Sequence, residues 1–161
     1  MANQKEDVRL RIIGDGGHAA VVREVVGAMD VIYDDGWCFI AVGDNRARRK
    51  EARAHEHLRF PTLRHPSAVV SPSAKIGEGT IIMAGAIVAA QAVVGRHCIL
   101  NHGSTTDHHC HLGDFVHIAP GAHLCGNVTV EDGALIGVGA VAVPGACIRA
   151  WTLVEAGSVA K

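Results

Sequence analysis

The 161-residue sequence predicts a mainly β protein, a parallel β-helix with a small α/β segment in front of it. The first observation is a six-residue period: from Val70 to Val154, every sixth residue is Val, Ile or Leu at thirteen of fifteen positions. The second is that the residue four places further on in each repeat is never larger than Val. The third is that only 4% of the residues are aromatic while 48% are hydrophobic, which favours thin repetitive layers.

Each repeat supplies a short strand and a turn, and three repeats complete a triangular coil of 18 residues. The aliphatic residue fills the interior of the coil, and the small residue fits its corner. Coils stack through parallel strand pairing at roughly 4.8 Å, so five coils rise about 24 Å. No coil buries its own apolar face, so only the stack is stable. We expect this β-helix over residues 66–161.

Residues 1–65 are expected to form a shortened α/β domain. A short apolar strand, Leu10–Ile13, runs into a glycine-rich turn, and a helix follows over Ala19–Met29. A second strand over Trp37–Val42 leads into a basic helical stretch, Arg46–His57. Glycines between a strand and a helix let backbone amides face an anion, although a tight turn is the simpler interpretation.

Composition excludes several classes of function. The net charge of −1, without a long basic run, gives no electrostatic case for nucleic acid or anionic membranes as partners. The polar start of the chain predicts no signal peptide, and no apolar run is long enough to span a membrane. Five cysteines without CxxC spacing suit a reduced, cytoplasmic protein.

Several short motifs are more specific than composition; they are Gly14–His18, Phe39–Asn45, His65–Ala68, Asp107–Cys110, Phe115–Ile118 and Cys125–Val128. Together they resemble the family of sialic acid O-acetyltransferases and sugar-nucleotide N-acetyltransferases, over nearly the whole chain. The resemblance implies a small Rossmann-like domain, a left-handed β-helix, a homotrimer and acetyl-CoA as co-substrate. The left-handedness follows from this resemblance and not from the spacing.

The histidines carry the expected chemistry. Acyl transfer from a thioester needs a base and a donor for the oxyanion, and histidine suits the first role because its pKa lies near neutrality. His108 is two places beyond an inward position and should face outward, with Gly126 stacked above it one coil later. The resemblance implies that His108 is the base, that Gly126 and His117 contact acetyl-CoA, and that Val138 and Ala156 touch it as well.

The resemblance also implies contacts with a sugar nucleotide, by Gly16, Gly17, His18, Gly43 and the acidic pair Asp34 and Asp35. Three features depart from the family pattern. His109 stands beside the base where the family commonly has an acidic residue, the chain lacks a tail after Lys161, and the N-terminal domain is about fifteen residues short. Val31–Tyr33 resembles a further strand of the family, and only Asp34–Gly36 separate it from the strand over Trp37–Val42. This is fewer residues than a parallel crossover needs, so the two segments form a hairpin or one strand is lost.

Two other classes of function are compatible with a β-helix. A zinc enzyme of the γ-carbonic anhydrase type needs a histidine pair such as His97 and His102 plus a third histidine two coils earlier, but that position is Pro61, so we expect no metal. A non-catalytic trimeric scaffold is the second alternative. Among enzymes, N-acetylation of a nucleotide-linked amino sugar is preferred over O-acetylation of a sialic-type sugar. We interpret His97, His102, His111 and His123 as solvated or subunit-interface residues, and expect no cysteine nucleophile.

Overall fold

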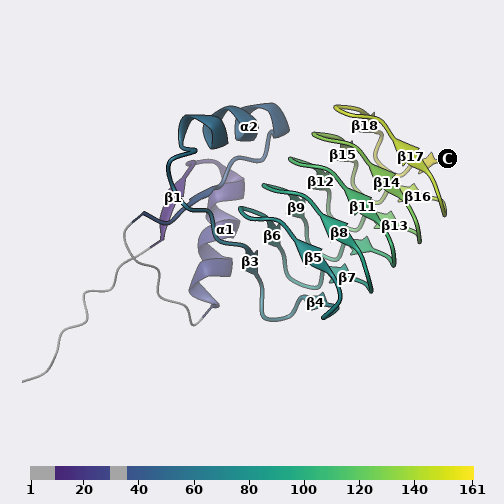
Figure 1. The fold of residues 1–161 in the computed structure, drawn as a ribbon, viewed down its shortest axis with the longest axis horizontal. Helices are drawn as coiled ribbons and strands as arrows, with labels where there is room; N and C mark the ends of the chain where they lie inside the picture. The colour runs from purple at the N-terminus through teal and green to yellow at the C-terminus, as the bar shows by residue number, and fades with distance from the viewer. Residues whose placement is uncertain (1–9, 30–35) are drawn as a thin grey trace, which may run out of the picture.

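The computed structural model describes residues 10–29 and 36–161, and places a small α/β unit against a parallel β-solenoid (Figure 1). Strands β1 (Arg11–Ile13) and β2 (Cys38–Ile40) pair in parallel, and helix α1 (Gly17–Gly27) lies between them in sequence. Helix α2 (Asn45–Ala54) follows β2. The strand-like segment predicted at Val31–Tyr33, with Asp34 and Asp35 after it, lies outside the described residues.

The solenoid is built from strands of two residues in three parallel sheets. The β3 sheet contains β3 (Leu63–Arg64), β6 (Ile81–Ile82), β9 (Ile99–Leu100), β12 (His117–Ile118), β15 (Leu135–Ile136) and β18 (Leu153–Val154). The β4 sheet contains β4 (Val69–Val70), β7 (Ile87–Val88), β10 (Thr105–Thr106), β13 (His123–Leu124), β16 (Val141–Ala142) and β19 (Val159–Ala160). The β5 sheet contains β5 (Lys75–Ile76), β8 (Val93–Val94), β11 (His111–Leu112), β14 (Thr129–Val130) and β17 (Cys147–Ile148).

Three corners join these sheets. The first corner runs from the β3 sheet to the β4 sheet and includes residues 101–104, 119–122, 137–140 and 155–158. The second runs from the β4 sheet to the β5 sheet and includes residues 107–110, 125–128 and 143–146. The third returns to the β3 sheet and includes residues 77–80, 95–98, 113–116, 131–134 and 149–152. Each face of the triangular prism therefore lies opposite one corner.

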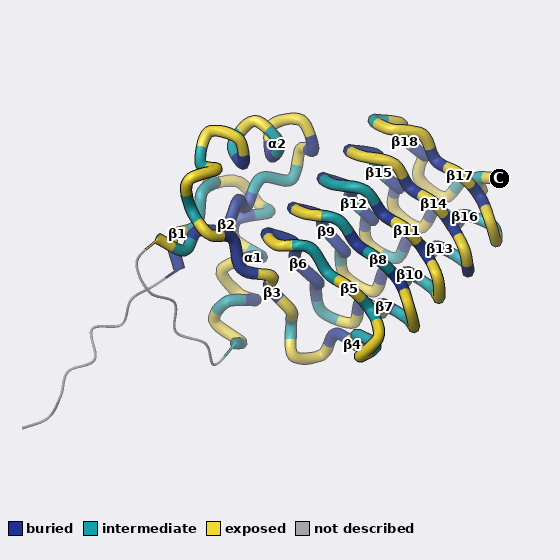
Figure 2. Tube along the Cα trace, in the orientation of Figure 1, coloured by how far each residue is buried: buried dark blue, intermediate teal, exposed yellow. Residues whose placement is uncertain are grey.

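The six-residue pattern determines the packing, as predicted. The second residue of most strands points inward, and Leu100, Ile118 and Leu124 are at most 1% exposed. The small residues fill the corners, where Ala86 and Ala122 are fully buried. Figure 2 shows the resulting buried interior along the coils. The fold class predicted from the sequence, a mainly β protein with a parallel solenoid of about five turns, is confirmed.

The small unit covers the outer face of the β3 sheet over its first coils. The outward row begins with Leu63, Ile81 and Ile99, which are at most 1% exposed and pack in one cluster with Val22 and Phe39. The next residue of the same row, at position 117, is only half-buried. The cover therefore ends at His117, and a rim forms there between the two parts of the chain.

A buried arginine fastens α2 to the third corner. Arg48 is 1% exposed, and each of its five N–H groups has an oxygen acceptor. Two acceptors are the backbone oxygens of His97 at 2.8 Å and Phe115 at 3.0 Å, one coil apart. Asn45 Nδ2 donates to the oxygen of Gly133, on the next coil, at 3.0 Å. Burial lowers the pKa of Arg48 to about 10, so it stays charged at neutral pH.

Local chemistry sets the helix boundaries, which differ slightly from the sequence prediction. Helix α1 begins two residues earlier than expected, directly at Gly17, because Gly16 adopts the extended N-cap conformation. Helix α2 begins after Asp44, whose Oδ1 accepts from the Ala47 N–H at 2.7 Å. Neither of these helices is long and apolar enough to cross a membrane. The domain division at residue 65 stays a prediction.

Candidate active site

The second corner presents the predicted base to solvent. His108 is exposed, and its backbone N–H donates to Asp107 Oδ1 at 2.7 Å. Asp107 therefore caps the corner and does not contact the imidazole through that oxygen. The side chain of His108 is accessible to a reactant from solvent.

Gly126 lies directly against the His108 ring, one coil further along. A Cβ at position 126 would stand 2.5 Å from His108 Cε1 and 2.6 Å from Nε2, so only glycine leaves the ring where it is. Among the described residues, no oxygen accepts the Gly126 N–H. The reason is local: the equivalent amide of His108 is capped by the preceding Asp107, whereas Gly126 follows Cys125, which has no side-chain oxygen. The corner thus combines an imidazole and an uncommitted amide donor.

His109 adds a second imidazole to this corner. Its Nδ1 lies 3.1 Å from His108 Nδ1, and the two rings meet edge to face with centroids 5.2 Å apart. Such a contact needs one protonated and one unprotonated nitrogen. If His108 donates from Nδ1, its Nε2 keeps a lone pair and can accept a proton. His109 adopts a positive φ of 58° at the corner, which brings its ring back toward His108.

A second group of polar residues lies at the rim beside the small unit. Asn101 Oδ1 accepts from the His102 N–H at 2.8 Å, which orients its amide so that Nδ2 donates to His117 Nε2 at 3.1 Å. His117 therefore carries its proton on Nδ1. The His18 side chain packs beside Gly43, where a Cβ would be 3.7 Å from His18 Cβ.

The rim histidines are neutral. Burial, with the charges of Arg48 and His18, lowers the pKa of His117 to about 3. Burial, with Arg48 and His102, lowers the pKa of His18 to about 4. His18 Nε2 has no hydrogen-bond partner among the described residues. A neutral imidazole can donate one hydrogen bond and accept another, so the rim suits polar, uncharged groups of a ligand.

The other predicted residues are distributed over the same two regions. Gly16 and Gly17 form the exposed start of α1, next to His18. Gly14 before them has a φ of 130° and approaches Ala41 O so closely that no other residue fits. Val138, which is 57% exposed, and Ala156 point outward from the first corner.

One chain does not bring all the predicted residues together. His108, His109 and Gly126 occupy the second corner, whereas His117 belongs to the β3 sheet, on the opposite side of the prism. Sequence reasoning missed Asn101 and assigned His102 to solvent or a subunit interface, although both help to hold His117. The spacing gave a signal, since positions 101 and 117 lie near one another on adjacent coils. Arg48 was also missed, because a basic stretch gives no sign that one of its side chains is buried.

The expectation of a solvated or subunit-interface side chain is wrong for His97, which is buried within the chain, stacked on Phe115 at 5.2 Å and edge-on to Phe60 at 4.7 Å. Burial, chiefly, lowers the pKa of His97 to about 4. Within residues 10–29 and 36–161, no three His, Cys, Asp or Glu side chains gather closely enough to hold a metal ion. The five cysteines are unpaired in this structure.

Residues 73–108 match the family model described as bacterial transferase hexapeptide, six repeats. No curated protein sequence gives a match. The acetyltransferase domain of PglB from Neisseria gonorrhoeae is 34% identical, with a TM-score of 0.88 over 96% of this chain and 91% of that chain. PerB from Caulobacter crescentus, in complex with CoA and GDP-perosamine, is 38% identical, with a TM-score of 0.88 over 94% of this chain and 88% of that chain. WeeI from Acinetobacter baumannii shares the fold, with a TM-score of 0.81 at 21% identity over 94% and 91% of the two chains.

Proposed function

The chain belongs to the hexapeptide-repeat family of left-handed β-helix sugar acetyltransferases, and from this we propose that it transfers an acetyl group from acetyl-CoA to the amino group of a nucleotide-linked amino sugar. We assign His108 as the general base. The observation that carries this assignment is the His108 imidazole lying against Gly126, whose N–H has no acceptor among the described residues. An imidazole that can take a proton, next to an amide that can donate to an oxyanion, supports this assignment.

The reaction follows from this pair. The sugar amine attacks the thioester carbonyl carbon, and a C–N bond forms while His108 Nε2 takes a proton from the amine. The carbonyl oxygen becomes an oxyanion, which accepts a hydrogen bond from the Gly126 N–H. The C–S bond then breaks, and the proton held by His108 passes to the departing CoA sulfur. The products are the acetamido sugar and CoA thiol, and His108 is neutral again.

His109 is assigned as the residue that orients the base. By accepting from His108 Nδ1 at 3.1 Å, it leaves Nε2 unprotonated for the amine. His117 is assigned to the acetyl-CoA pocket, where its Nδ1–H is available because Asn101 occupies Nε2. Val138 and Ala156 would lie along the bound CoA on the exposed first corner.

We further propose that the active site forms between copies in a homotrimer. His108 and His117 lie on opposite sides of one prism, so a neighbouring prism must supply one of them. The outward row of the β4 sheet also exposes Val69 at 61% and Ile87 at 42% near one end and Val159 at 58% at the other, with polar residues between them. Exposed apolar side chains of this kind mark association surfaces, and closed cyclic symmetry is the ordinary result for identical copies.

The sugar nucleotide is assigned to the start of α1. The N–H groups of Gly17 and His18 have no backbone acceptors among the described residues, and the N-terminus of a helix favours phosphate. Asp34 and Asp35, which would contact the base or ribose, lie outside the described residues. The reaction is expected in the cytoplasm, where thiols stay reduced.

Release of CoA thiol from acetyl-CoA tests the activity, with GDP-linked and UDP-linked 4-amino sugars and free sialic-type sugars as acceptors. We expect turnover with a nucleotide-linked amino sugar, and a 10²–10⁴-fold loss of kcat in His108→Ala, the usual contribution of a positioned base. His111→Ala, a neighbouring exposed histidine on β11, serves as control and should retain activity. Turnover only with the sialic-type sugars would replace N-acetylation by O-acetylation. A fully active His108→Ala would exclude this base.

Mixing variants tests whether two copies share one site. His108→Ala and His117→Ala are each expected to be nearly inactive. When the two are unfolded and refolded together, mixed trimers contain some sites with both native histidines, so activity should reappear. Two variants that stay inactive together, in a sample where an affinity tag on one variant co-purifies the other, would place both histidines in the site of a single chain.

A further inference from the structure

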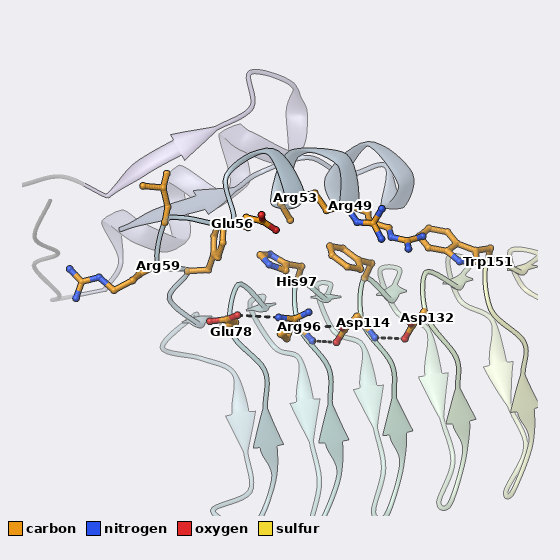
Figure 3. A pocket seen from close by; sticks show the side chains of 14 residues that line it. Arg49, Arg53, Glu56, Arg59, Glu78, Arg96, His97, Asp114, Asp132 and Trp151 are labelled. Carbon is orange, nitrogen blue, oxygen red and sulfur yellow. Dashed lines mark hydrogen bonds and ion pairs between the residues drawn. The ribbon is translucent and has the colours of Figure 1, made fainter. Parts of the chain in front are cut away.

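Helix α2 and the last coil enclose a pocket that the proposed reaction does not use. Its volume is about 320 Å³, and it is lined by Arg46, Arg49, Lys50, Arg53 and Trp151, with no acidic side chain among the described residues that line it. A cavity of about 360 Å³ adjoins it along α2 and shares Arg49, Arg53 and Trp151 (Figure 3). This region lies at the third corner, away from both the second corner and the start of α1.

Two of the arginines are held in place by an aromatic ring. The guanidinium carbons of Arg46 and Arg49 lie 4.7 Å and 5.2 Å from the centre of the Trp151 ring. The ring itself packs on Gly133, where any Cβ would collide with it. Stacking on an indole stabilises a guanidinium and limits its movement. The two charges are therefore fixed near one another before any ligand arrives.

These cations have no carboxylate partner within the part of the chain that the structure describes. No carboxylate within residues 10–29 or 36–161 forms an ion pair with Arg46, Arg49, Lys50 or Arg53. Three acids of the adjoining cavity are engaged elsewhere: Glu78 and Asp114 pair with Arg96, and Asp132 accepts from the Asp114 N–H. The fourth, Glu56, lines that cavity but not the pocket of the four cations. Four like charges around one pocket repel one another, and an anion placed among them relieves that repulsion.

The shape of the pocket selects the kind of anion. A volume of about 320 Å³ is at the small end for ligand sites. Planar guanidiniums match phosphate oxygens through paired hydrogen bonds. A helix that binds membranes needs bulky apolar residues beside its cations, whereas alanines are the only apolar residues in the sequence of α2, NRARRKEARA. The geometry points to a binding site for the phosphate or diphosphate group of a soluble ligand, held by Arg46, Arg49, Lys50 and Arg53 over Trp151.

Calorimetry with inorganic pyrophosphate tests the site on the full chain. We expect a pyrophosphate site in 50 mM KCl whose affinity is at least tenfold lower in Arg49→Gln/Arg53→Gln, because each lost guanidinium removes charge-assisted bonds. Trp151→Asn, which tolerates the left-handed backbone at that position (φ 58°), should weaken binding several-fold through the loss of the stacking surface. The matched control, Arg11→Gln/Lys75→Gln, removes two exposed charges from β1 and β5 and should bind as the parent does.

Two further arms identify the source of the phosphate and the location of the site. Gly17→Val should leave this pyrophosphate binding intact, because it alters only the start of α1. Sedimentation with phosphatidylglycerol vesicles should leave the protein in the supernatant. An equal loss of affinity in Arg11→Gln/Lys75→Gln would mean that binding depends only on the net charge of the protein, which would contradict a specific site. Unchanged affinity in Arg49→Gln/Arg53→Gln would also overturn the site. Binding to the vesicles without binding to pyrophosphate would replace the soluble ligand by a membrane surface.

Discussion

Gly126→Ala should inactivate the enzyme while leaving the fold intact. The added Cβ would lie 2.5 Å from His108 Cε1, whereas ordinary contacts begin near 3.4 Å. The ring must therefore move by roughly 0.9 Å, and a displacement of that size at a reacting group costs about 10²-fold in rate. The N–H of residue 126 is retained, so the loss arises from the displaced base and not from the oxyanion donor.

The stability of Gly126→Ala should hardly change. Gly126 is not among the residues with positive φ, so alanine fits its backbone. The atom it would meet is the end of an exposed side chain, which can turn away. Replacing glycine also restricts the unfolded chain, which contributes about 0.4–1 kcal/mol of stability. We expect the melting temperature to stay within a few degrees of the parent value.

Steady-state kinetics and thermal unfolding, measured side by side, check this prediction. Gly27→Ala is the matched control, because nothing lies within 4 Å of a Cβ at that position in α1. It should keep full activity. The double variant His108→Ala/Gly126→Ala should be no slower than His108→Ala alone, since the displaced ring is then absent. An active Gly126→Ala, or a double variant much slower than His108→Ala, would refute the reasoning.

Three further outcomes are expected. Arg48→Met should lower the free energy of unfolding by at least about 3 kcal/mol in urea denaturation, and Arg48→Lys by less, because a buried carbonyl without its donor costs about 1–3 kcal/mol. An unchanged urea midpoint would contradict the role of Arg48 in fastening α2 to the third corner. His109→Leu should lower kcat about tenfold without changing the KM for acetyl-CoA, and His109→Glu should retain activity because a carboxylate also accepts from Nδ1; equal loss in both would remove the orienting role. The free energy of unfolding should fall as pH falls from 6.5 toward 4, by up to about 1.4 kcal/mol per pH unit for each of His18, His97 and His117, because the unfolded chain takes up protons near pH 6.5 and the folded chain only near pH 4 or 3. His97→Phe should flatten the dependence of the melting temperature on pH over that range. A melting temperature of the parent that does not change with pH would contradict the burial of neutral histidines.

Much of the fold could be predicted because the six-residue period constrains every coil in the same way. The inward position of Leu100 and the corner position of Ala122 follow from spacing alone, and so does Gly126 over His108. The rim could not be predicted so well. The Asn101–His117 bond depends on how the small unit covers the β3 sheet, and Arg48 becomes buried only because three carbonyls of successive coils face α2. Contacts between the small α/β unit and the solenoid follow no repeating pattern in the sequence, so spacing does not predict them.

The attachment of α2 across three coils has a consequence for how the solenoid unfolds. A stack in which each coil contacts only its neighbours opens from its ends, one coil at a time. Arg48 and Asn45 bond carbonyls at His97, Phe115 and Gly133, so the coils that carry them cannot separate one by one while α2 stays folded. Opening from the β3 end must therefore be cooperative, whereas β18 and β19 can open alone. In hydrogen exchange, amides of the final coil should exchange first, and those between positions 97 and 133 last and together.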